Sequence, residues 1–283
     1  MTESDFSINY TGLGGAIQLF SSLTNNAQPN SEFEVHTHYN EFEVYYFLQG
    51  DLYFSFEGKR YCVEEGSMII IANGMLHRPI IKNSCRYYRK RILFTKEIFG
   101  RFNISDFELY SILLKRKLLI VDSISVEKFQ LGKIFEEIEQ SLSLNTLYED
   151  YSSAFSLLTL LIKAEKNSIS YNFNQHCVYS TKTMEIIKFI DENLSEDLSY
   201  KKLSQHFFMS EKNLYKFFKK ETGFTLGNYI NERRIIKAQS LLNAGESACV
   251  AALNSGFCDY SVFYRSFLRK VGITPMEYIK NLK

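Results

Sequence analysis

The last hundred or so residues of the chain repeat themselves at a shift of 49 positions. When Gly223 is set against Gly272, the segment KNLYKFFKKETGFTLGNYI, which starts at Lys212, lies over SVFYRSFLRKVGITPMEYI, which starts at Ser261. Phenylalanine, glycine, threonine, tyrosine and isoleucine recur at matching places in the two segments. An internal repeat of this length indicates that one supersecondary unit is built twice. The repeat therefore predicts an all-α domain made of two similar halves.

Each copy is predicted to contain a short helix, a turn and a longer helix. In the first copy, Leu198–Phe207 is the expected short helix, and Phe208-Met209 is the turn. Ser210 is a good N-cap for the longer helix, and Asp259 has the same role in the second copy. On both longer helices the apolar residues share one face and the basic residues lie opposite. This pattern is typical of two helix-turn-helix units in tandem.

The basic faces have two explanations. Lysine and arginine are often simply solvated on an outward helix face. A DNA-reading helix also needs such a face, because cations bind phosphates and a forked donor can meet guanine edges. The repeat favours DNA, because the shift of 49 places Lys216 on Arg265, so both helices carry a cation at the same position.

This region resembles the DNA-binding domain of the AraC/XylS family of bacterial transcription regulators. The resemblance is carried by SEKNLYKFFKKETG, by RRIIKAQSLL as the connecting helix, and by SGFCDYSVFYRSFLRKVGITPMEYI. In that family, each recognition helix enters one of two adjacent major grooves. The base-reading residues that it implies are Lys212, Tyr215, Lys216, Ser261, Val262 and Arg265, to which the basic outer faces add Lys219 and Arg269. The family commonly has arginine at the position of Lys216, so base specificity there is expected to be weaker.

The charge of the chain is divided unevenly along its length. Residues 181–283 hold 16 Lys+Arg and 11 Asp+Glu, a net +5, whereas residues 1–180 have a net −4. A basic C-terminal domain behind an acidic N-terminal one fits DNA contact confined to the C-terminal part. There is no segment like a signal peptide and no apolar run near about 20 residues, which predicts a cytoplasmic protein without a membrane partner. Five cysteines with no CxxC pair indicate reduced thiols.

Residues 31–95 are predicted to form a β-sheet domain. Short alternating segments such as EFEVYYFLQG and DLYFSFEGKRYCV are separated by turn positions at Gly50, Gly58 and Gly66. Many short strands at this spacing indicate a sandwich or a small barrel, to which residues 1–30 would add one or two irregular strands. The mouth of such a barrel can hold a ligand.

Four polar residues stand out in this domain. His36 and His38 lie two apart, and Glu43 follows them in the spacing HxH-x4-E-x6-G, while His77 ends the spacing G-x7-G-x2-H. The two spacings are similar to the two cupin motifs, although the second departs from its pattern at the proline and asparagine positions. In metal-binding cupins the matching residues are ligands. Three imidazole nitrogens and a carboxylate could hold a divalent first-row transition metal with positions left open.

The sequence leaves three roles open for these four residues. They can line an effector pocket, as in many AraC-type sensor domains, they can bind a metal, or they can be structural. The convergence of three of the five histidines in the chain disfavours a purely structural role. Tyr45, Tyr53, Arg78 and Arg91 are further candidates for hydrogen bonds to a polar ligand, but the pattern alone does not assign them to one side of the sheet.

Two helices are predicted between the barrel and the repeat. Val126–Leu142 and Tyr148–Ala164 have apolar residues at helical spacing, and the second is apolar around much of its circumference. They are expected to pair and to bury a face against the barrel or against a second subunit. The resemblance implies dimer contacts here, with internal packing as the alternative. The whole is an α+β chain with a cupin-like barrel at 1–100, a helical segment at 101–166, a linker at 167–180 and the DNA-binding domain at 181–283.

The resemblance implies a sequence-specific transcription regulator and not an enzyme. It implies a homodimer that binds double-stranded DNA, and RNA polymerase as a partner if it activates. A small-molecule effector, with carbohydrates as the leading class, would occupy the barrel, and no cofactor is expected other than the divalent metal considered above. One alternative is a metal-dependent cupin enzyme or metal sensor fused to a DNA-binding domain. Another is a regulator without an effector, its barrel plugged by some of its 24 Phe and 19 Tyr.

Overall fold

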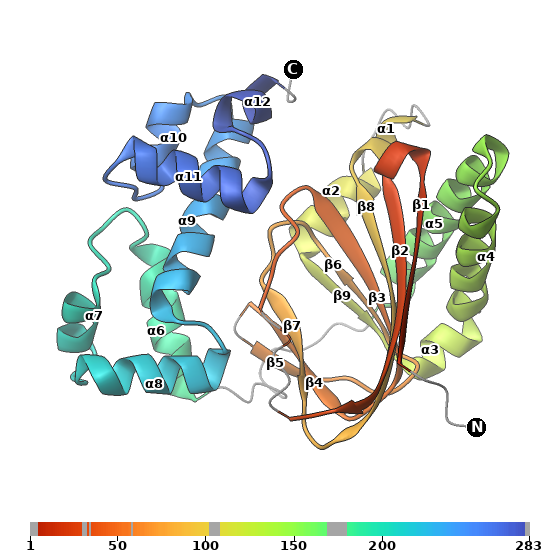
Figure 1. The fold of residues 1–283 in the computed structure, drawn as a ribbon, viewed down its shortest axis with the longest axis horizontal. Helices are drawn as coiled ribbons and strands as arrows, with labels where there is room; N and C mark the ends of the chain where they lie inside the picture. Colours follow the sequence, from red (N-terminus) through yellow and green to blue (C-terminus); the bar gives the residue numbers. More distant parts are fainter. Residues whose placement is uncertain are drawn as a thin grey trace. The chain divides into compact units, whose positions relative to one another are not determined.

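A computed structural model divides the chain into two compact units, Met1–Cys177 and Val178–Lys283 (Figure 1). The described residues are 5–29, 33, 35–57, 59–101, 108–168 and 180–280. Most of the predicted linker, residues 169–179, lies outside them. Within the described ranges, no helix is long and apolar enough to cross a membrane.

The first unit contains two antiparallel sheets. Six strands are ordered β1-β2-β8-β3-β6-β9 and three are ordered β5-β4-β7. The strands of the larger sheet are β1 Phe6–Gly12, β2 Ile17–Ala27, β3 Glu41–Gln49, β6 Met68–Ile71, β8 Cys85–Thr95 and β9 Leu118–Val121, and those of the smaller are β4 Leu52–Phe56, β5 Lys59–Cys62 and β7 His77–Ile81. The sheets enclose a core that includes Tyr45, Phe54 and Ile69. The expected cupin-like barrel is therefore confirmed.

Helices cover the outer face of the six-stranded sheet (Figure 1). They are α1 Glu97–Arg101, α2 Glu108–Arg116, α3 Ser123–Lys128, α4 Leu131–Leu144 and α5 Leu147–Asn167. The buried faces of α4 and α5 pack with outward-pointing strand residues such as Val44 and Ile92 in a second core. The predicted helix over Val126–Leu142 is in fact two helices, because Gln130 has a left-handed backbone with φ 57°. The pair thus buries one face against the barrel.

Two strands differ from the expectation. The segment read as irregular was residues 1–30; its described part contains a regular hairpin in which β1 and β2 pair from Phe6↔Leu23 to Gly12↔Ile17. Along β2, buried residues alternate with half-buried ones, which is the pattern of a strand that faces a core on one side. The strand β9 lies within the segment read as helical and extends the sheet by pairing with β6.

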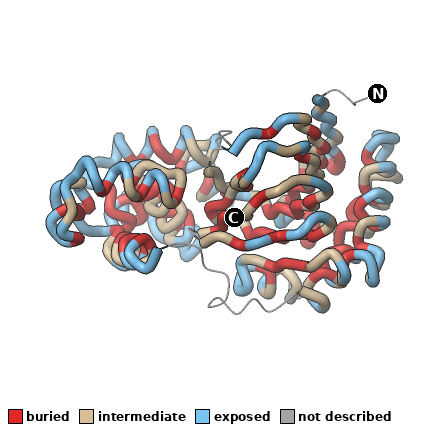
Figure 2. The backbone as a smooth tube through the Cα atoms, turned by 90° about the horizontal axis from the view of Figure 1, so that it is seen from below, coloured by how far each residue is buried: buried red, intermediate tan, exposed pale blue. Residues whose placement is uncertain are grey.

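The second unit is entirely helical within its described part. Its helices are α6 Thr181–Glu192, α7 Tyr200–His206, α8 Glu211–Thr222, α9 Leu226–Asn243, α10 Ala248–Asn254, α11 Tyr260–Val271 and α12 Pro275–Lys280. α7–α8 and α10–α11 are the two helix-turn-helix units, and α9 connects them. α8 and α11 both have 12 residues and both end at a left-handed glycine, Gly223 and Gly272, each with φ 83°. Figure 2 shows buried residues inside this unit and exposed residues on the outward helix faces.

Polar contacts join α9 to its neighbours within this unit. Arg233 Nε lies 2.8 Å from Asp191 Oδ1, and Arg234 Nε donates to the carbonyl oxygen of Leu194 at 3.0 Å. At the other side, Lys270 of α11 forms an ion pair with the buried Glu232. The connecting helix is therefore held by α6 and the residues just after it, and by α11.

Candidate functional sites

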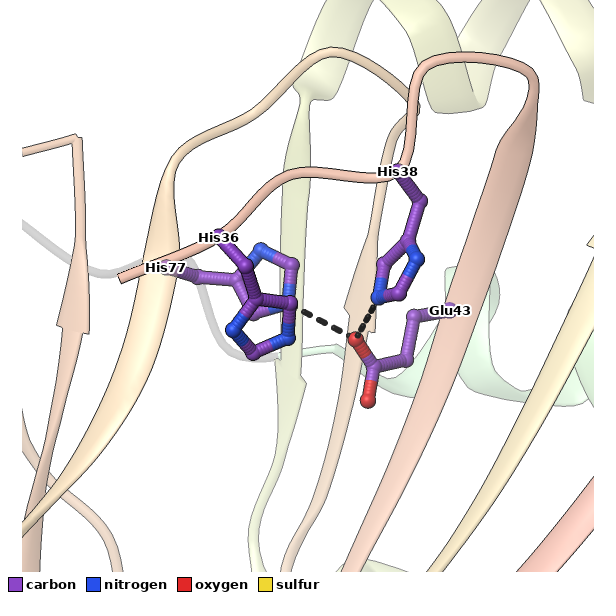
Figure 3. A group of neighbouring side chains, drawn as sticks. All are labelled: His36, His38, Glu43 and His77. Atoms are coloured by element: carbon purple, nitrogen blue, oxygen red, sulfur yellow. Dashed lines mark hydrogen bonds and ion pairs between the residues drawn. The ribbon is translucent and has the colours of Figure 1, made fainter. Parts of the chain in front are cut away.

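Four sequence-predicted polar residues converge inside the first unit (Figure 3). His36 and His38 lie in the segment that precedes β3, Glu43 lies on β3, and His77 begins β7. The segment is fixed by two backbone hydrogen bonds between His36 and His77, with N···O distances of 3.2 and 3.0 Å. One potential ligand atom from each of the four residues lies within 4.8 Å of the others. The four residues therefore form one cluster in the structure, as the sequence predicts.

Both ring nitrogens of His77 have hydrogen-bond partners, and the contact of Nε2 with Glu43 links the two sheets. Nδ1 lies 2.9 Å from the carbonyl oxygen of Met75, and Nε2 lies 2.7 Å from Glu43 Oε2. A carbonyl oxygen only accepts, so Nδ1 must carry a proton.

Glu43 is 1% exposed and faces two imidazoles and one guanidinium group. Burial alone would raise the pKa of this carboxyl, but the His77 and His38 imidazoles outweigh it and hold the pKa well below its usual range. His38 Nε2 lies 3.2 Å from Oε2, and Arg91 Nη1 lies 3.8 Å from Oε1. Glu43 is therefore a buried carboxylate, surrounded by side chains that favour its ionised form.

The cluster has the chemistry of a metal-binding site. His38 Nε2 is buried without a hydrogen bond of ordinary alignment among the described residues, despite its proximity to the carboxylate. The Nδ1 contact of His77 with a backbone carbonyl leaves Nε2 directed into the cluster, as in metal-ligating histidines. Three imidazoles and one carboxylate are a donor set for a first-row transition metal. The residues present fit such an ion.

The pairing of the strands shows which face of its sheet each of the other predicted pocket residues occupies. Tyr45 and Arg91 are paired neighbours on β3 and β8, on the inner face of the larger sheet. Tyr53 lies between the core residues Leu52 and Phe54, so it points to the outer face of the smaller sheet. Arg78 follows His77 on β7 and points outward for the same reason. Of the four candidates, Tyr45 and Arg91 share the inner face with the cluster.

Sequence reasoning missed a second polar group on this inner face. Tyr45 and Tyr87 are joined by a hydrogen bond between their hydroxyls, and Arg89 Nη1 donates to the Tyr87 hydroxyl at 2.8 Å. The alternation of Tyr87, Arg89 and Arg91 along CRYYRKRILF was a usable signal. Using this signal required knowing which face of β8 points into the barrel.

The predicted DNA-contacting residues lie on the outward faces of α8 and α11. All eight are exposed, namely Lys212, Tyr215, Lys216, Lys219, Ser261, Val262, Arg265 and Arg269. Their helices are anchored by fully buried residues on the opposite face, such as Phe218 and Phe267. The caps are as predicted: Ser210 Oγ accepts from the backbone N–H of Asn213, and Asp259 accepts from two N–H groups of the next turn. The second unit therefore carries two similar exposed helix faces, one on α8 and one on α11.

Comparisons with known proteins match both halves of the chain. A cupin-domain model matches residues 26–87, and a helix-turn-helix-domain model matches residues 203–281. The chain is similar to the HTH-type transcriptional activator RhaS of Escherichia coli strain SE11, with 23% identity over 149 residues, 52% of this chain and 52% of that protein. The XylDLEGF operon transcriptional activator of Pseudomonas putida is 27% identical over 159 residues, 54% of this chain and 48% of that protein. The chain spans about half the length of these curated relatives.

The chain is also similar to a solved structure. It is the DNA-binding domain of AdpA in complex with a target DNA, with 24% identity, 36% of this chain and 93% of that chain covered, and a TM-score of 0.35.

The fold and the domain matches define a two-domain protein in which a cupin domain precedes a helix-turn-helix domain. With transcriptional activators as its relatives, the chain has the domain pair of an AraC/XylS family regulator, and the resemblance drawn from its motifs is confirmed.

Proposed function

We propose that the protein is a sequence-specific, DNA-binding transcription regulator whose barrel senses a small molecule. The observation that carries this proposal is the duplicated face: α8 and α11 share their length, their buried anchors and their glycine caps, and both point basic residues outward. A merely solvated face gives no reason for that repetition. The role is regulatory, and a bacterial transcription regulator would act in the cytoplasm.

The two recognition helices would contribute unequally to base reading. Arg265 can donate two parallel hydrogen bonds to the O6 and N7 atoms of guanine, whereas Lys216 offers a point charge. Lys219 and Arg269, one turn further along each helix, are placed to bind phosphates. The second helix-turn-helix unit is therefore the stronger source of specificity.

The barrel would act on DNA binding through a shift of population. A ligand on the inner face favours the arrangement of the sensor and DNA-binding units that binds it better, and affinity for DNA changes by that differential binding energy. The resemblance alone implies carbohydrates as the ligand class. RNA polymerase is a partner if the protein activates.

A homodimer through α5 is part of the proposal. Tyr148, Phe155 and Ile162 recur every seven residues on the face of α5 that points away from the barrel, with exposed fractions of 81%, 57% and 45%. Leu144 and Leu147 extend this surface around the α4–α5 turn. An exposed apolar stripe that returns every seven residues can pack against the same stripe of a second copy.

The function is tested by selecting bound sequences from random double-stranded DNA with the purified full-length chain. We expect one motif to be enriched, with two base sets separated by about one helical turn. Affinity for this motif should exceed that for random DNA by at least about 10³-fold at physiological salt. Binding that falls with salt but shows no enriched motif would reduce the protein to a nonspecific DNA binder.

A second candidate function, metal sensing or metal-dependent catalysis in the cupin domain, is favoured by the His/Glu cluster. Such an ion would be held by His36, His38, Glu43 and His77, and it would supply Lewis acidity at the inner face. The untagged protein should then copurify with about one transition metal per chain, and His36→Ala should abolish it. A metal content near zero after purification and reconstitution would exclude this candidate.

A further inference from the structure

We propose that the effector of the barrel is an organic carboxylate held by the guanidinium groups of Arg89 and Arg91. This inference rests on the proposed sensing function and names the chemical class of its ligand. Both arginines project from β8 onto the inner face of the larger sheet, two residues and so about 7 Å apart. They continue the polar stripe that begins at the His/Glu cluster.

Arg89 is a partly buried cation without a carboxylate at ion-pair distance among the described residues. Its contacts are with neutral groups: Nη1 donates to Tyr87, Nε donates to Ser22 Oγ at 3.3 Å, and the guanidinium lies 5.0 Å from the ring centres of Phe33 and Tyr87. Removing a charge from water without an opposite charge is costly. An anion from outside the chain would supply that charge.

Arg91 is only weakly paired. Its Nη1 lies 3.8 Å from Glu43, but that carboxylate is already engaged by the closer nitrogens of His77 and His38. Arg91 Nε is buried and has no hydrogen-bond acceptor in the described part of the chain. The Arg91 guanidinium also lies 5.3 Å from the centre of the Phe20 ring. Its forked donor is therefore held by aromatic contact and still has N–H groups to offer.

The hydrogen-bond inventory around Arg89 has a surplus of donors. The Tyr45 and Tyr87 hydroxyls share one hydrogen bond, which uses one O–H hydrogen, and no acceptor among the described residues receives the other. Arg89 has five N–H donors, of which two are used in the bonds to Tyr87 and Ser22. The ligand group that fits these surplus donors accepts hydrogen bonds and donates none, and an ionised carboxylate is such a group.

The aromatic surroundings favour an organic acid over an inorganic anion. Phe20, Phe33 and Tyr87 flank the two guanidinium groups and offer apolar surface to the body of a ligand. A carboxylate is planar and matches the guanidinium fork. A sugar acid would satisfy both this inference and the carbohydrate class, because its hydroxyls could reach the His/Glu cluster.

The test compares charged ligands with neutral counterparts at constant ionic strength. The melting temperature of the full-length protein is measured with glucuronate against glucose, benzoate against benzyl alcohol, and phosphate and sulfate as inorganic anions. We expect a saturable rise with at least one carboxylate at a concentration at least tenfold lower than with its neutral counterpart. Equal effects of the neutral counterpart, an effect of phosphate or sulfate only, or no carboxylate effect would overturn the inference.

Variants assign the effect to these arginines. Arg89→Gln and Arg91→Gln should each weaken the carboxylate response at least tenfold, whereas Arg86→Gln, on the outer face of the same strand, should leave it unchanged. Arg89→Lys keeps the charge without the fork and should retain part of the response, which separates ligand loss from misfolding. A response that survives Arg89→Gln and Arg91→Gln would contradict the inference.

DNA binding by the same preparations separates this inference from the proposed function. A protein that selects a DNA motif but shows no carboxylate preference remains a regulator, with a different effector. A protein that binds a carboxylate but selects no DNA motif keeps the anion site and loses the regulator function.

Discussion

Phe208 and Gly256 occupy equivalent places in the two helix-turn-helix units. Each lies two residues after the end of a seven-residue helix, α7 or α10, and each has a positive φ, 52° and 97°. The surroundings differ. A Cβ atom added to Gly256 would lie 1.9 Å from the carbonyl oxygen of Leu194, whereas the Phe208 side chain is 96% exposed. The same turn therefore demands glycine in one unit and tolerates a strained phenylalanine in the other.

We predict that Gly256→Ala destabilises the second unit by at least about 2 kcal/mol, because the left-handed backbone and the backbone clash both oppose a side chain. Urea unfolding followed by circular dichroism measures this change. Phe208→Asn should act in the opposite direction and stabilise by about 1 kcal/mol, since asparagine adopts the left-handed region more readily. Leu253→Asn, at an exposed helical position, is the control and should give no gain. A stable Gly256→Ala protein would show that the turn rearranges.

We predict that Arg265→Ala weakens binding to the selected DNA motif by about 1–3 kcal/mol and relaxes specificity at the contacted base pair. Lys216→Ala should weaken binding with a smaller loss of discrimination, because lysine lacks the fork. Electrophoretic mobility shifts on the selected motif and on random DNA measure both effects. If Arg265→Ala weakens the two DNAs equally, this arginine contacts phosphate only.

Glu43 predicts a pH dependence of the stability of the first unit. Its lowered pKa in the folded chain means that the unfolded chain takes up a proton first as the pH falls. The stability contributed by the ionised Glu43 is complete above its ordinary pKa, about 4.5, and is lost as the pH falls below it through the lowered folded value. We would measure the urea concentration at half-unfolding from pH 6 downwards, across a range of roughly three pH units. This midpoint should fall more steeply for the wild type than for Glu43→Gln. Glu137→Gln, on the exposed face of α4, should follow the wild type. Parallel curves for wild type and Glu43→Gln would contradict the prediction.

Ile162→Glu tests the pairing of α5. Placing charge in the exposed apolar stripe should weaken self-association by at least about tenfold without lowering helix content, because glutamate is a good helix former. Sedimentation equilibrium of the full-length protein measures the dissociation constant. Gln140→Glu adds the same charge to α4 outside the stripe and should change nothing. A dimer as stable in Ile162→Glu as in the wild type would move the interface elsewhere.

The sequence predicts the second unit better than the first, for physical reasons. A helix depends on neighbours three and four residues away, so the caps at Ser210 and Asp259 and the buried stripes can be read directly. A strand depends on partners far along the chain. The strand β9 was missed because a four-residue apolar run such as Leu118–Val121 cannot be assigned before β6 is known as its partner. The break at Gln130 has no marker residue, since glutamine is an ordinary helix former.

The candidate sites follow the same division. His36, His38, Glu43 and His77 could be grouped because their spacings resemble motifs. Arg89 belongs to no motif, and only the register of β8 against β3 places it inside the barrel. Its surplus donors depend on which groups surround it in space, and no local pattern records them.

The connecting helix α9 limits how the regulated promoters can change. Its 18 residues span about 27 Å, and a ligand cannot lengthen a continuous helix tied at both sides. One inserted base pair between the two base sets contacted by one chain displaces the second by about 3.4 Å and rotates it by roughly 35°. Insertions and deletions inside such a site should therefore be eliminated by selection, while those between the sites of the two chains of the proposed dimer should accumulate. Promoter divergence should then be concentrated outside a segment whose length α9 sets.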